Sequence, residues 1–418
     1  MDWSLQVTKL QASYQSVFCV GGVARMNKKV KELGSAQIDE MFDLAAYAFN
    51  FEDTFERRER FQTIAEHSWN YGFFNEEEQL MSQVMATPFP VAFHGKELLM
   101  AGIGYVASYP EARGQGGINQ IMEQILTDCR ERDVTLSYLA PFSYPFYRRY
   151  GYELLFEKVH YELASRDFPA VKKVPGKMVR TSFDQAQEAI AKIYPKMADN
   201  QRGAVAREAW WIDFKFRQKK GHQFALYYDE AGAVAGYLVY RLDTPTFTIV
   251  EWGYLTHTAF QALARFVGSH SGAFETFAFA CGYAGNNLNT LLANPFAKTT
   301  ITPDMMARIV DLAKFLAAYP FPKTQVAFAV EVTEDAYASW NEGIFEVVLV
   351  DGEVRVNPVT DSMLPRVSGT IQSLTQLFMG YKKVQELVFQ EKLICSEALV
   401  EKLAELIPDQ KPVLNDYF

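Results

Sequence analysis

A glycine-rich turn at Arg113–Ile118 is the part of the sequence whose residue types point most directly to chemistry. The turn reads RGQGGI, follows an apolar run over 100–108 and precedes an amphipathic run. A strand, such a turn and a helix can hold a pyrophosphate, because the first N–H groups of a helix have no partner and its dipole is positive there. Glycine lets the backbone approach the phosphates, and Arg113 can add charge-assisted hydrogen bonds.

The spacing around this turn excludes two common nucleotide-binding motifs. No lysine–serine or lysine–threonine pair follows the glycines, so the P-loop pattern fails. The GxGxxG spacing of a dinucleotide-binding fingerprint is also absent. The turn therefore predicts a pyrophosphate ligand of another kind.

Composition describes an ordinary globular protein with an acidic balance. The 418 residues favour two or three domains, and 49% hydrophobic with 22% charged residues are typical of a chain that forms a core. The net charge of −9 argues against non-specific nucleic-acid binding and suits a cationic substrate. Acidic solubility alone is the alternative explanation of that charge.

Cysteine and histidine spacing gives no sign of a metal or a disulfide framework. The four cysteines are scattered without a CxxC pair, and the six histidines lack metal-ligand spacing. No apolar run reaches the ~18 residues of a membrane span, and the N-terminus lacks the pattern of a signal peptide. We expect a cytoplasmic chain with no metal and no membrane span.

Hydrophobic periodicity predicts an α+β (mixed α/β) protein that begins with a domain over 26–165, after a disordered extension over 1–25. In that domain the spacing of apolar residues predicts helices and strands in the order βααβββαβ…β. The predicted helices are 37–49, 56–67 and the run from 118, and the predicted strands include 89–93, 97–108, 134–139 and 152–163.

Two further domains are expected over 166–299 and 300–418. The second has a hairpin at 224–241, a strand at 247–252 and a helix at 258–267, so it echoes the first as a degenerate repeat. Its strand-to-helix turn, 253–257, has no arginine and no glycine pair, and should not bind the pyrophosphate ligand. The third is predicted to contain a helix over 303–318, strands at 325–332 and 344–356, and helices at 371–379 and 397–406.

Three segments carry a resemblance to a known family. AYAFNF at 46–51, YPEARGQG at 109–116 and FYRRYGY at 146–152 resemble the Eis-type (enhanced intracellular survival) acetyltransferases of the GNAT superfamily. The likeness covers about 26–418 and implies tandem GNAT-type domains followed by a domain like a sterol carrier protein. It further implies acetyl transfer from acetyl-CoA to amines, including aminoglycosides and lysine side chains, by homo-oligomers, often hexamers. Ile118 departs from the wider pattern, which has glycine or alanine there.

The resemblance implies where the cofactor would lie. The backbone of the strand before the turn would align the pantetheine and polarise the thioester carbonyl, although ordinary strand pairing is the alternative role. The residues assigned to acetyl-CoA are Val106, Ala107, Ser108, Arg113, Gly114, Gln115, Gly116 and Gly117.

Two catalytic residues are implied in the same way. Tyr147 matches the general acid of the family, and a phenol with a pKa of ~10 suits protonation of a thiolate. The alternative is packing, since five other aromatic residues lie within 142–152. Phe418 would supply its main-chain carboxylate as general base, with a frayed end as the alternative.

The acceptor site is expected at the end of the first helix, where aromatic and acidic side chains would suit a cationic amine. The residues are Phe49, Phe51, Glu52 and Asp53, and core aromatics beside solvated acids are the alternative explanation. The leading hypothesis is an N-acetyltransferase that uses direct transfer in a ternary complex, with aminoglycoside, polyamine or lysine-type acceptors. The alternatives are a non-catalytic protein that binds an apolar ligand in the sterol-carrier-like domain, and a protein-lysine acetyltransferase.

Overall fold

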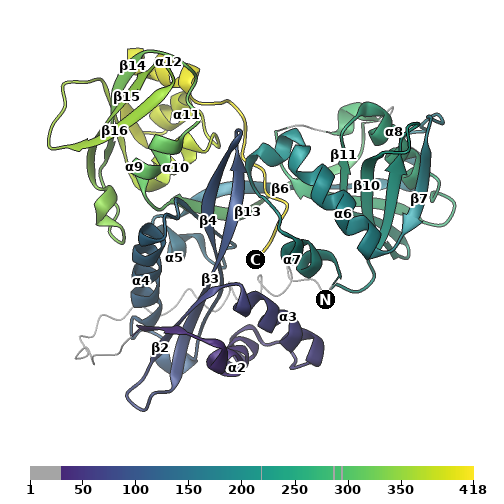
Figure 1. The fold of residues 1–418 in the computed structure, drawn as a ribbon, viewed down its shortest axis with the longest axis horizontal. Coiled ribbons are helices and arrows are strands. Elements are labelled where there is room, and N and C mark those ends of the chain that lie inside the picture. The colour runs from purple at the N-terminus through teal and green to yellow at the C-terminus, as the bar shows by residue number, and fades with distance from the viewer. Residues whose placement is uncertain (1–29, 218, 286–287, 293–294) are drawn as a thin grey trace.

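The chain forms three units in this computed structural model, which describes residues 30–217, 219–285, 288–292 and 295–418. The first unit and the third lie on one side of Figure 1 and the second on the other, and the last residues of the chain run back into the space where all three meet. The extension expected over 1–25 lies outside the described residues.

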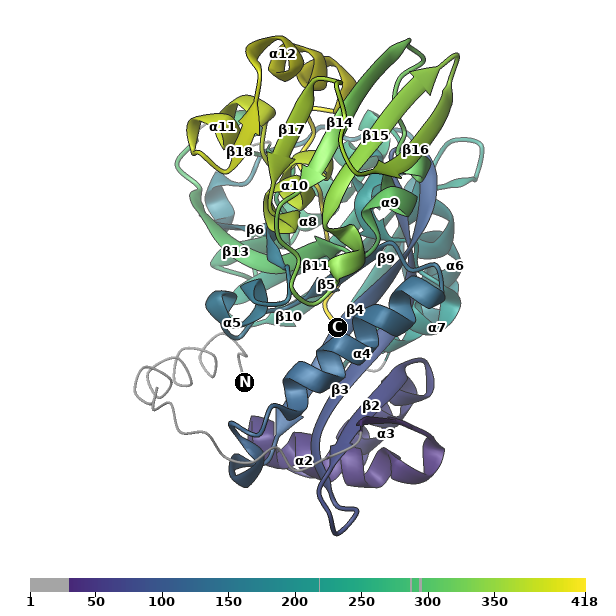
Figure 2. The same ribbon diagram turned by 90° about the vertical axis from the view of Figure 1, so that its left-hand side faces the viewer.

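The first unit is a sheet covered by helices on both faces. Apolar residues of α2 and α3 pack on one face beside Met85 and Met100, and the buried side of α4 packs on the other beside Ala101 and Ile103 (Figure 2). This arrangement follows from the amphipathic pattern of these helices, because each buries only one side. The elements are β1 (Val30–Leu33), α2 (Ile38–Phe49), α3 (Phe55–Glu66), β2 (Trp69–Phe74), β3 (Leu80–Phe93), β4 (Lys96–Ser108), α4 (Gly117–Glu131), β5 (Leu136–Leu139), α5 (Tyr144–Arg148) and β6 (Glu153–Ala164).

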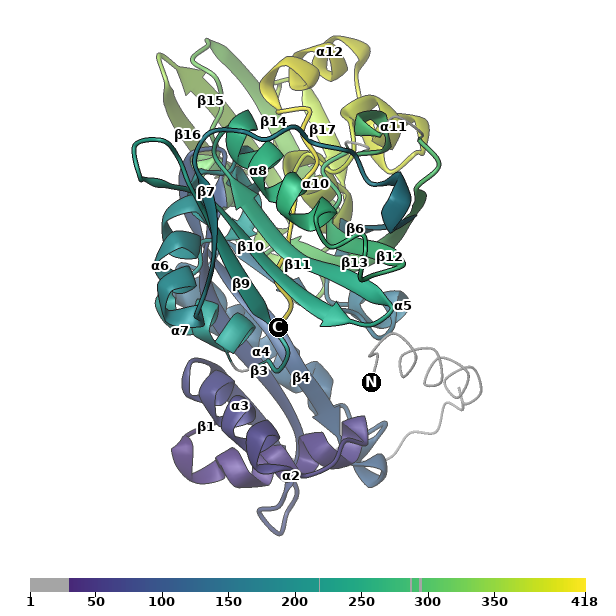
Figure 3. The ribbon, with the colours of Figure 1, turned by 90° about the vertical axis from the view of Figure 1, so that its right-hand side faces the viewer.

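The second unit repeats this layout, as the sequence predicted. β11 and β12 are parallel and joined by α8, just as β4 and β5 are parallel and joined by α4. α6 and α8 cover opposite faces of the sheet formed by β9, β10 and β11 (Figure 3). The elements are β7 (Lys177–Thr181), α6 (Phe183–Ile193), β8 (Arg202–Val205), α7 (Ala209–Ile212), β9 (Gln223–Tyr228), β10 (Val234–Asp243), β11 (Thr246–Tyr254), α8 (His257–Gly268) and β12 (Thr276–Gly282), with short turns at η4 (Tyr194–Lys196) and the π-helical η6 (Asp213–Arg217).

A late strand completes the sheet of the first unit and corrects a sequence prediction, while β6 pairs with β12, so that the first two units share one sheet. β13 (Lys298–Ile309) lies between β5 and β6 and is antiparallel to both. The helix predicted over 303–318 is therefore wrong for its first half. The register of the strand shifts between Pro303 and Met305, and proline can occupy such a bulge because it has no N–H to donate. The helix starts only after Asp311, whose side chain accepts from the N–H of Lys314 at 3.0 Å.

The third unit is a five-stranded sheet with helices. Its strand order is β16-β15-β14-β17-β18. The predicted hairpin and the last two predicted helices are present, and β17, α11 and β18 were not predicted. The elements are α9 (Leu312–Ala318), β14 (Val326–Val332), β15 (Gly343–Val350), β16 (Glu353–Val359), β17 (Arg366–Gly369), α10 (Ile371–Phe378), α11 (Val384–Phe389), β18 (Leu393–Cys395) and α12 (Glu397–Leu406).

A buried ion pair fixes the third unit to the first. Arg308 on β13 and Asp335 after β14 are almost completely buried, with 2.6 Å between Nη2 and Oδ2. Asn341 donates to the same carboxylate at 2.8 Å. Removing one partner of such a pair leaves an uncompensated buried charge, so this contact strongly specifies how the two units dock.

Along the described residues, no helix is both long and apolar enough to cross a membrane.

Candidate active site

The glycine-rich turn has the geometry that the sequence predicted for it. Gly116 precedes α4 with a φ of 77°, in the left-handed region that favours glycine, and Gly114 has a φ of 79°. A Cβ on Gly117 would lie 2.8 Å from the ring of Phe73 and 3.1 Å from Oγ of Ser82. The backbone at the start of α4 therefore follows a path that only glycine allows, and the first N–H groups of a 15-residue helix have no acceptor within the helix.

The strand before the turn diverges from its parallel neighbour. The described β4–β5 ladder ends at Ile103, while β4 continues along β3 as far as Ser108. Between Gly104 and Ala107 the strand takes three steps opposite two steps of β3, so β4 carries a bulge. Tyr105 in this bulge has a φ of 49°, which is strained for an aromatic residue.

The bulge and the turn place the predicted cofactor residues on one continuous stretch. Val106 lies in the bulge beside Tyr105, Ala107 is buried, and the hydroxyl of Ser108 donates to Oγ of Ser82 at 2.7 Å. The same Ser82 lies against Gly117, so the end of β4 and the start of α4 are fixed side by side. The residues present would fit an extended cofactor, with the first N–H groups of α4 available to a pyrophosphate and the end of β4 to a thioester arm.

Phe418 packs against the face of β4 that carries Gly102 and Gly104, which have no side chains. A Cβ on Gly102 would lie 2.6 Å from Cδ2 of Phe418, and a Cβ on Gly104 would lie 3.3 Å from the carbonyl carbon of Phe418. The ring of Phe418 also lies 5.2 Å from that of Phe89, and only 8% of the residue is exposed. Phe418 is therefore a packed residue whose main-chain carboxyl group lies beside the bulge, and it is not frayed.

Tyr147 lies on the α4 side of the sheet. It is 2% exposed and belongs to one apolar cluster with Ile121 of α4, and partly buried Val106 and Ile118 pack against that cluster. Its ring lies 5.4 Å from Phe142, as the packing alternative required. Tyr147 is thus buried in the same apolar cluster against which Val106 of β4 packs.

Contacts from the third unit, β13 and β6 hold the short helix α5, which carries Tyr147, and the residues after it. Gln372 of α10 donates to the carbonyl of Arg148 at 2.9 Å, and Arg308 donates to the carbonyl of Tyr150. Arg148 itself forms two 2.8 Å hydrogen bonds with Glu153. A five-residue helix has little stability of its own, so these contacts keep α5 in place.

The residues predicted for the acceptor divide into two groups. The ring of Phe49 lies 6.2 Å from that of Tyr105 in the bulge, and Phe51 packs 5.6 Å from Phe42. In contrast, Asp53 is exposed and pairs with Arg58 at 2.6 Å, and this hydrogen bond holds its pKa below the usual value.

Glu52 is also exposed, and its carbonyl accepts from Arg57 at 3.1 Å. Phe49 thus lies beside the bulge, whereas the carboxylate of Asp53 is bound by Arg58.

Sequence reasoning missed Tyr105. Its ring packs 4.9 Å from Phe61, and burial raises its pKa. The residue lies in the middle of a predicted strand, and only the pairing with β3 reveals that it is bulged. No local pattern of residues could have shown this.

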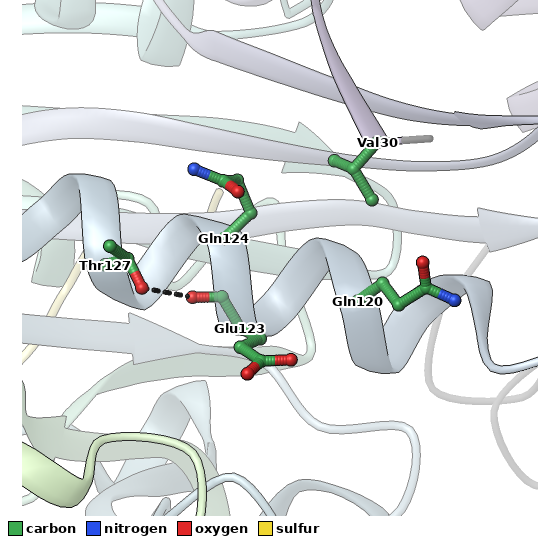
Figure 4. Close-up of a pocket in the computed structure, with 5 residues that line it drawn as sticks. All are labelled: Val30, Gln120, Glu123, Gln124 and Thr127. Carbon is green, nitrogen blue, oxygen red and sulfur yellow. Dashed lines mark hydrogen bonds between the residues drawn. The ribbon is translucent and has the colours of Figure 1, made fainter. Parts of the chain in front are cut away.

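Two cavities lie away from these residues. One, of about 430 Å³, opens on the outer face of α4 and is lined by Gln120, Glu123, Gln124, Thr127 and Val30 (Figure 4). The other, of about 280 Å³, lies between the first two units and includes Pro90 and Arg207. The first is larger but contains none of the predicted site residues, so the geometry of β4, α4 and Phe418 is the better guide to the chemistry.

Comparisons with known proteins agree with this geometry. Two family models, each described as an acetyltransferase (GNAT) domain, match residues 29–155 and 203–309, and a sterol carrier protein domain matches 312–415. A solved protein of Enterococcus faecalis, described as a probable N-acyltransferase, is 46% identical, with a TM-score of 0.91, over 94% of this chain and 100% of its own. The chain belongs to the GNAT acetyltransferases.

More distant structures share the fold of this GNAT protein. Eis1 from Mycobacterium abscessus is 19% identical with a TM-score of 0.75, and a GCN5-related N-acetyltransferase from Anabaena variabilis is 20% identical with a TM-score of 0.83. Each covers 94% of this chain and 100% of its own. No curated protein matches the chain.

The expected Eis-type layout of two GNAT domains and a sterol-carrier-like domain is confirmed. The protein is an N-acetyltransferase with acetyl-CoA as its co-substrate. Within the described residues, no group of three His, Cys, Asp or Glu side chains is arranged to hold a metal ion.

The turn yields a prediction with a matched control. Gly116→Ala should weaken acetyl-CoA binding about tenfold, because alanine disfavours a φ of 77° and moves the N–H groups of α4. Gly95→Ala introduces the same strain in the β3–β4 hairpin, at a φ of 81° and in equally open space. Calorimetric titration of both full-length variants would contradict the assignment if their affinities fell equally.

Proposed function

We propose that this enzyme transfers acetyl directly from acetyl-CoA to a cationic amine of the aminoglycoside, polyamine or lysine type, within a ternary complex. The observation that carries the proposal is the carboxyl group of Phe418 beside the β4 bulge. A carboxylate there can attract an ammonium group and accept its proton. The net charge of −9 and the aromatic rings of Phe49 and Tyr105 suit such an acceptor.

The carboxylate of Phe418 takes one proton from the substrate ammonium, and the neutral amine then attacks the thioester carbonyl. As the C–S bond breaks, the nitrogen loses its second proton to solvent. Tyr147 would give its phenolic proton to the leaving thiolate, from the opposite side of β4. N–H groups of β4 beyond the described β4–β5 ladder would polarise the carbonyl oxygen as negative charge develops on it.

Direct transfer is supported by the state of Cys129, the cysteine on α4. It lies on the buried side of this helix with 1% exposure, and burial raises the pKa of its thiol to about 12. A thiol that stays protonated and buried is a poor nucleophile, so an acetyl-cysteine intermediate at this residue is disfavoured.

The binding-protein alternative has less support. Apolar residues of the third unit, including Phe328, Val330, Leu374 and Phe378, are packed into its core, and α10 is used to dock on β13 and β6. Protein-lysine acetylation, a cytoplasmic location, and assembly into a homo-oligomer, up to a hexamer, stay predictions. Light scattering of the purified chain would test the last of these.

The proposed reaction class predicts acceptor-dependent release of CoA thiol. Polyamines, aminoglycosides and lysine peptides would each be offered with acetyl-CoA, and the released thiol measured. We expect small cationic amines to raise the rate well above hydrolysis. Release with peptides alone would favour the protein acetyltransferase instead, and acetyl-CoA binding without release for any amine would favour the binding protein.

Tyr147→Phe tests the acid. We expect kcat to fall about 100-fold or more with little change in the KM for acetyl-CoA, because the leaving thiolate loses its proton donor and the ring still packs. Tyr152→Phe is the control, since the hydroxyl of Tyr152 is hydrogen-bonded to that of Ser137 on β5 at 2.7 Å. Equal rates for Tyr147→Phe and the parent enzyme would exclude the assignment.

Adding one glycine after Phe418 tests the base. The extension moves the carboxylate by up to ~3.6 Å, and a displaced reacting group typically costs about 100-fold in rate. Acetyl-CoA affinity should stay the same, because the turn at α4 is untouched. Unchanged turnover by the extended chain would show that this carboxylate is not the base.

A further inference from the structure

A cluster of four buried charges lies at residue 416, two positions before the proposed base. Asp416 is fully buried and accepts from Nε of Arg207 at 2.9 Å and from Nζ of Lys215 at 3.2 Å. Arg207 also forms two 2.7 Å hydrogen bonds with Glu251. Two positive and two negative side chains thus cancel inside the protein, with Lys215 and Glu251 only slightly exposed.

Neutral donors complete the environment of the two carboxylates. Trp211 Nε1 donates to Asp416 at 2.9 Å, and the hydroxyl of Tyr194 donates to the same carboxylate at 3.2 Å. The hydroxyl of Tyr237 donates to Glu251 at 2.8 Å. Burial alone would raise the pKa of Asp416, but Arg207 and Lys215 outweigh it and lower that pKa to about 2.

Every partner of Asp416 in this cluster comes from the second unit. Arg207 follows β8, Trp211 is on α7 and Lys215 is on η6, while Glu251 is on β11. The neighbouring residues of the tail are fixed to the same unit: the N–H of Gly282 donates to Oδ1 of Asn415 at 2.8 Å. The N–H of Val413 donates to the carbonyl of Arg202 at 3.0 Å. The tail is therefore fixed at successive residues, with Asp416 as its most strongly bound side chain.

This cluster limits where Phe418 can lie. Two residues span at most ~7 Å, so a fixed Asp416 confines the end of the chain to a small region. Trp211 contacts both positions, because its N–H binds Asp416 and its ring lies 6.4 Å from the ring of Phe418. Buried charge networks add little stability over apolar packing, but they do specify a unique arrangement in some proteins.

We propose that Asp416 is a positioning residue, and that the second GNAT domain serves the reaction by holding it. In this view, the domain that lacks the cofactor turn supplies Arg207, Lys215 and Trp211 to keep the carboxylate of Phe418 against Gly104. The inference rests on the proposed function for its catalytic consequence. The anchoring of the tail by the second domain can be tested without an activity assay.

Asp416→Asn in the full-length protein tests both the anchoring of the tail and its effect on catalysis. The amide keeps the shape of the side chain but loses the charge that binds Arg207 and Lys215. We expect kcat to fall about 100-fold with the KM for acetyl-CoA unchanged, because the base is displaced and the cofactor turn is not. Carboxypeptidase should release Phe418 about tenfold faster, because loss of charged hydrogen bonds frees the tail.

A matched control separates anchoring from general instability. Val330→Ala removes buried methyl groups from β14 in the third unit and should lower stability without changing kcat or the release of Phe418. Should Asp416→Asn fail to fold, Trp211→Phe removes one hydrogen-bond donor and keeps an aromatic ring.

Unchanged release of Phe418, or release as fast in Val330→Ala, would overturn the anchoring. Faster release with normal kcat would overturn the catalytic role. If glycine extension also leaves turnover unchanged, the proposed base fails while the anchoring stands on the carboxypeptidase result.

Discussion

The contact between Phe418 and the two glycines of β4 is the constraint around which the site is arranged. Gly102 and Gly104 lie on one face of the strand, and a side chain at either position would meet the ring or the carboxyl group of Phe418. The same strand bulges at Tyr105 and ends beside the turn that starts α4. A larger residue at either glycine would thus displace Phe418 from its place beside the bulge.

The second and third units each stabilise a different part of this site. Gln372 of the third unit and Arg308 of β13, which is paired to Asp335 of the third unit, bind the backbone carbonyls of Arg148 and Tyr150, just after Tyr147. The second unit binds the tail that carries Phe418 through Arg207 and its neighbours. The groups proposed as acid and base therefore depend on different parts of the chain, and both meet at a strand of the first unit.

The elements predicted correctly are those whose conformation depends on residues close together in the chain. The turn at Gly116, the buried side of α4 and the hairpin at 344–356 follow from glycine, helical spacing and alternation within a few residues. The helix predicted from residue 303 is wrong over 303–309, because the place of β13 between β5 and β6 depends on partners about 150 residues away. Asp416 was missed for the same reason, since its partner Arg207 is 209 residues distant.

The place of β13 also has a consequence for how the protein is made. β5 and β6 do not pair with each other in the described sheet: β13 lies between them, and its residues Met306, Ala307 and Ile309 are completely buried. During synthesis, the first GNAT domain must wait for residue 309 before its sheet can close. Until then, the facing edges of β5 and β6 are unpaired and open to wrong partners. A ribosome at residue 165 has therefore made nearly all of that domain's sequence but cannot yet have made its fold.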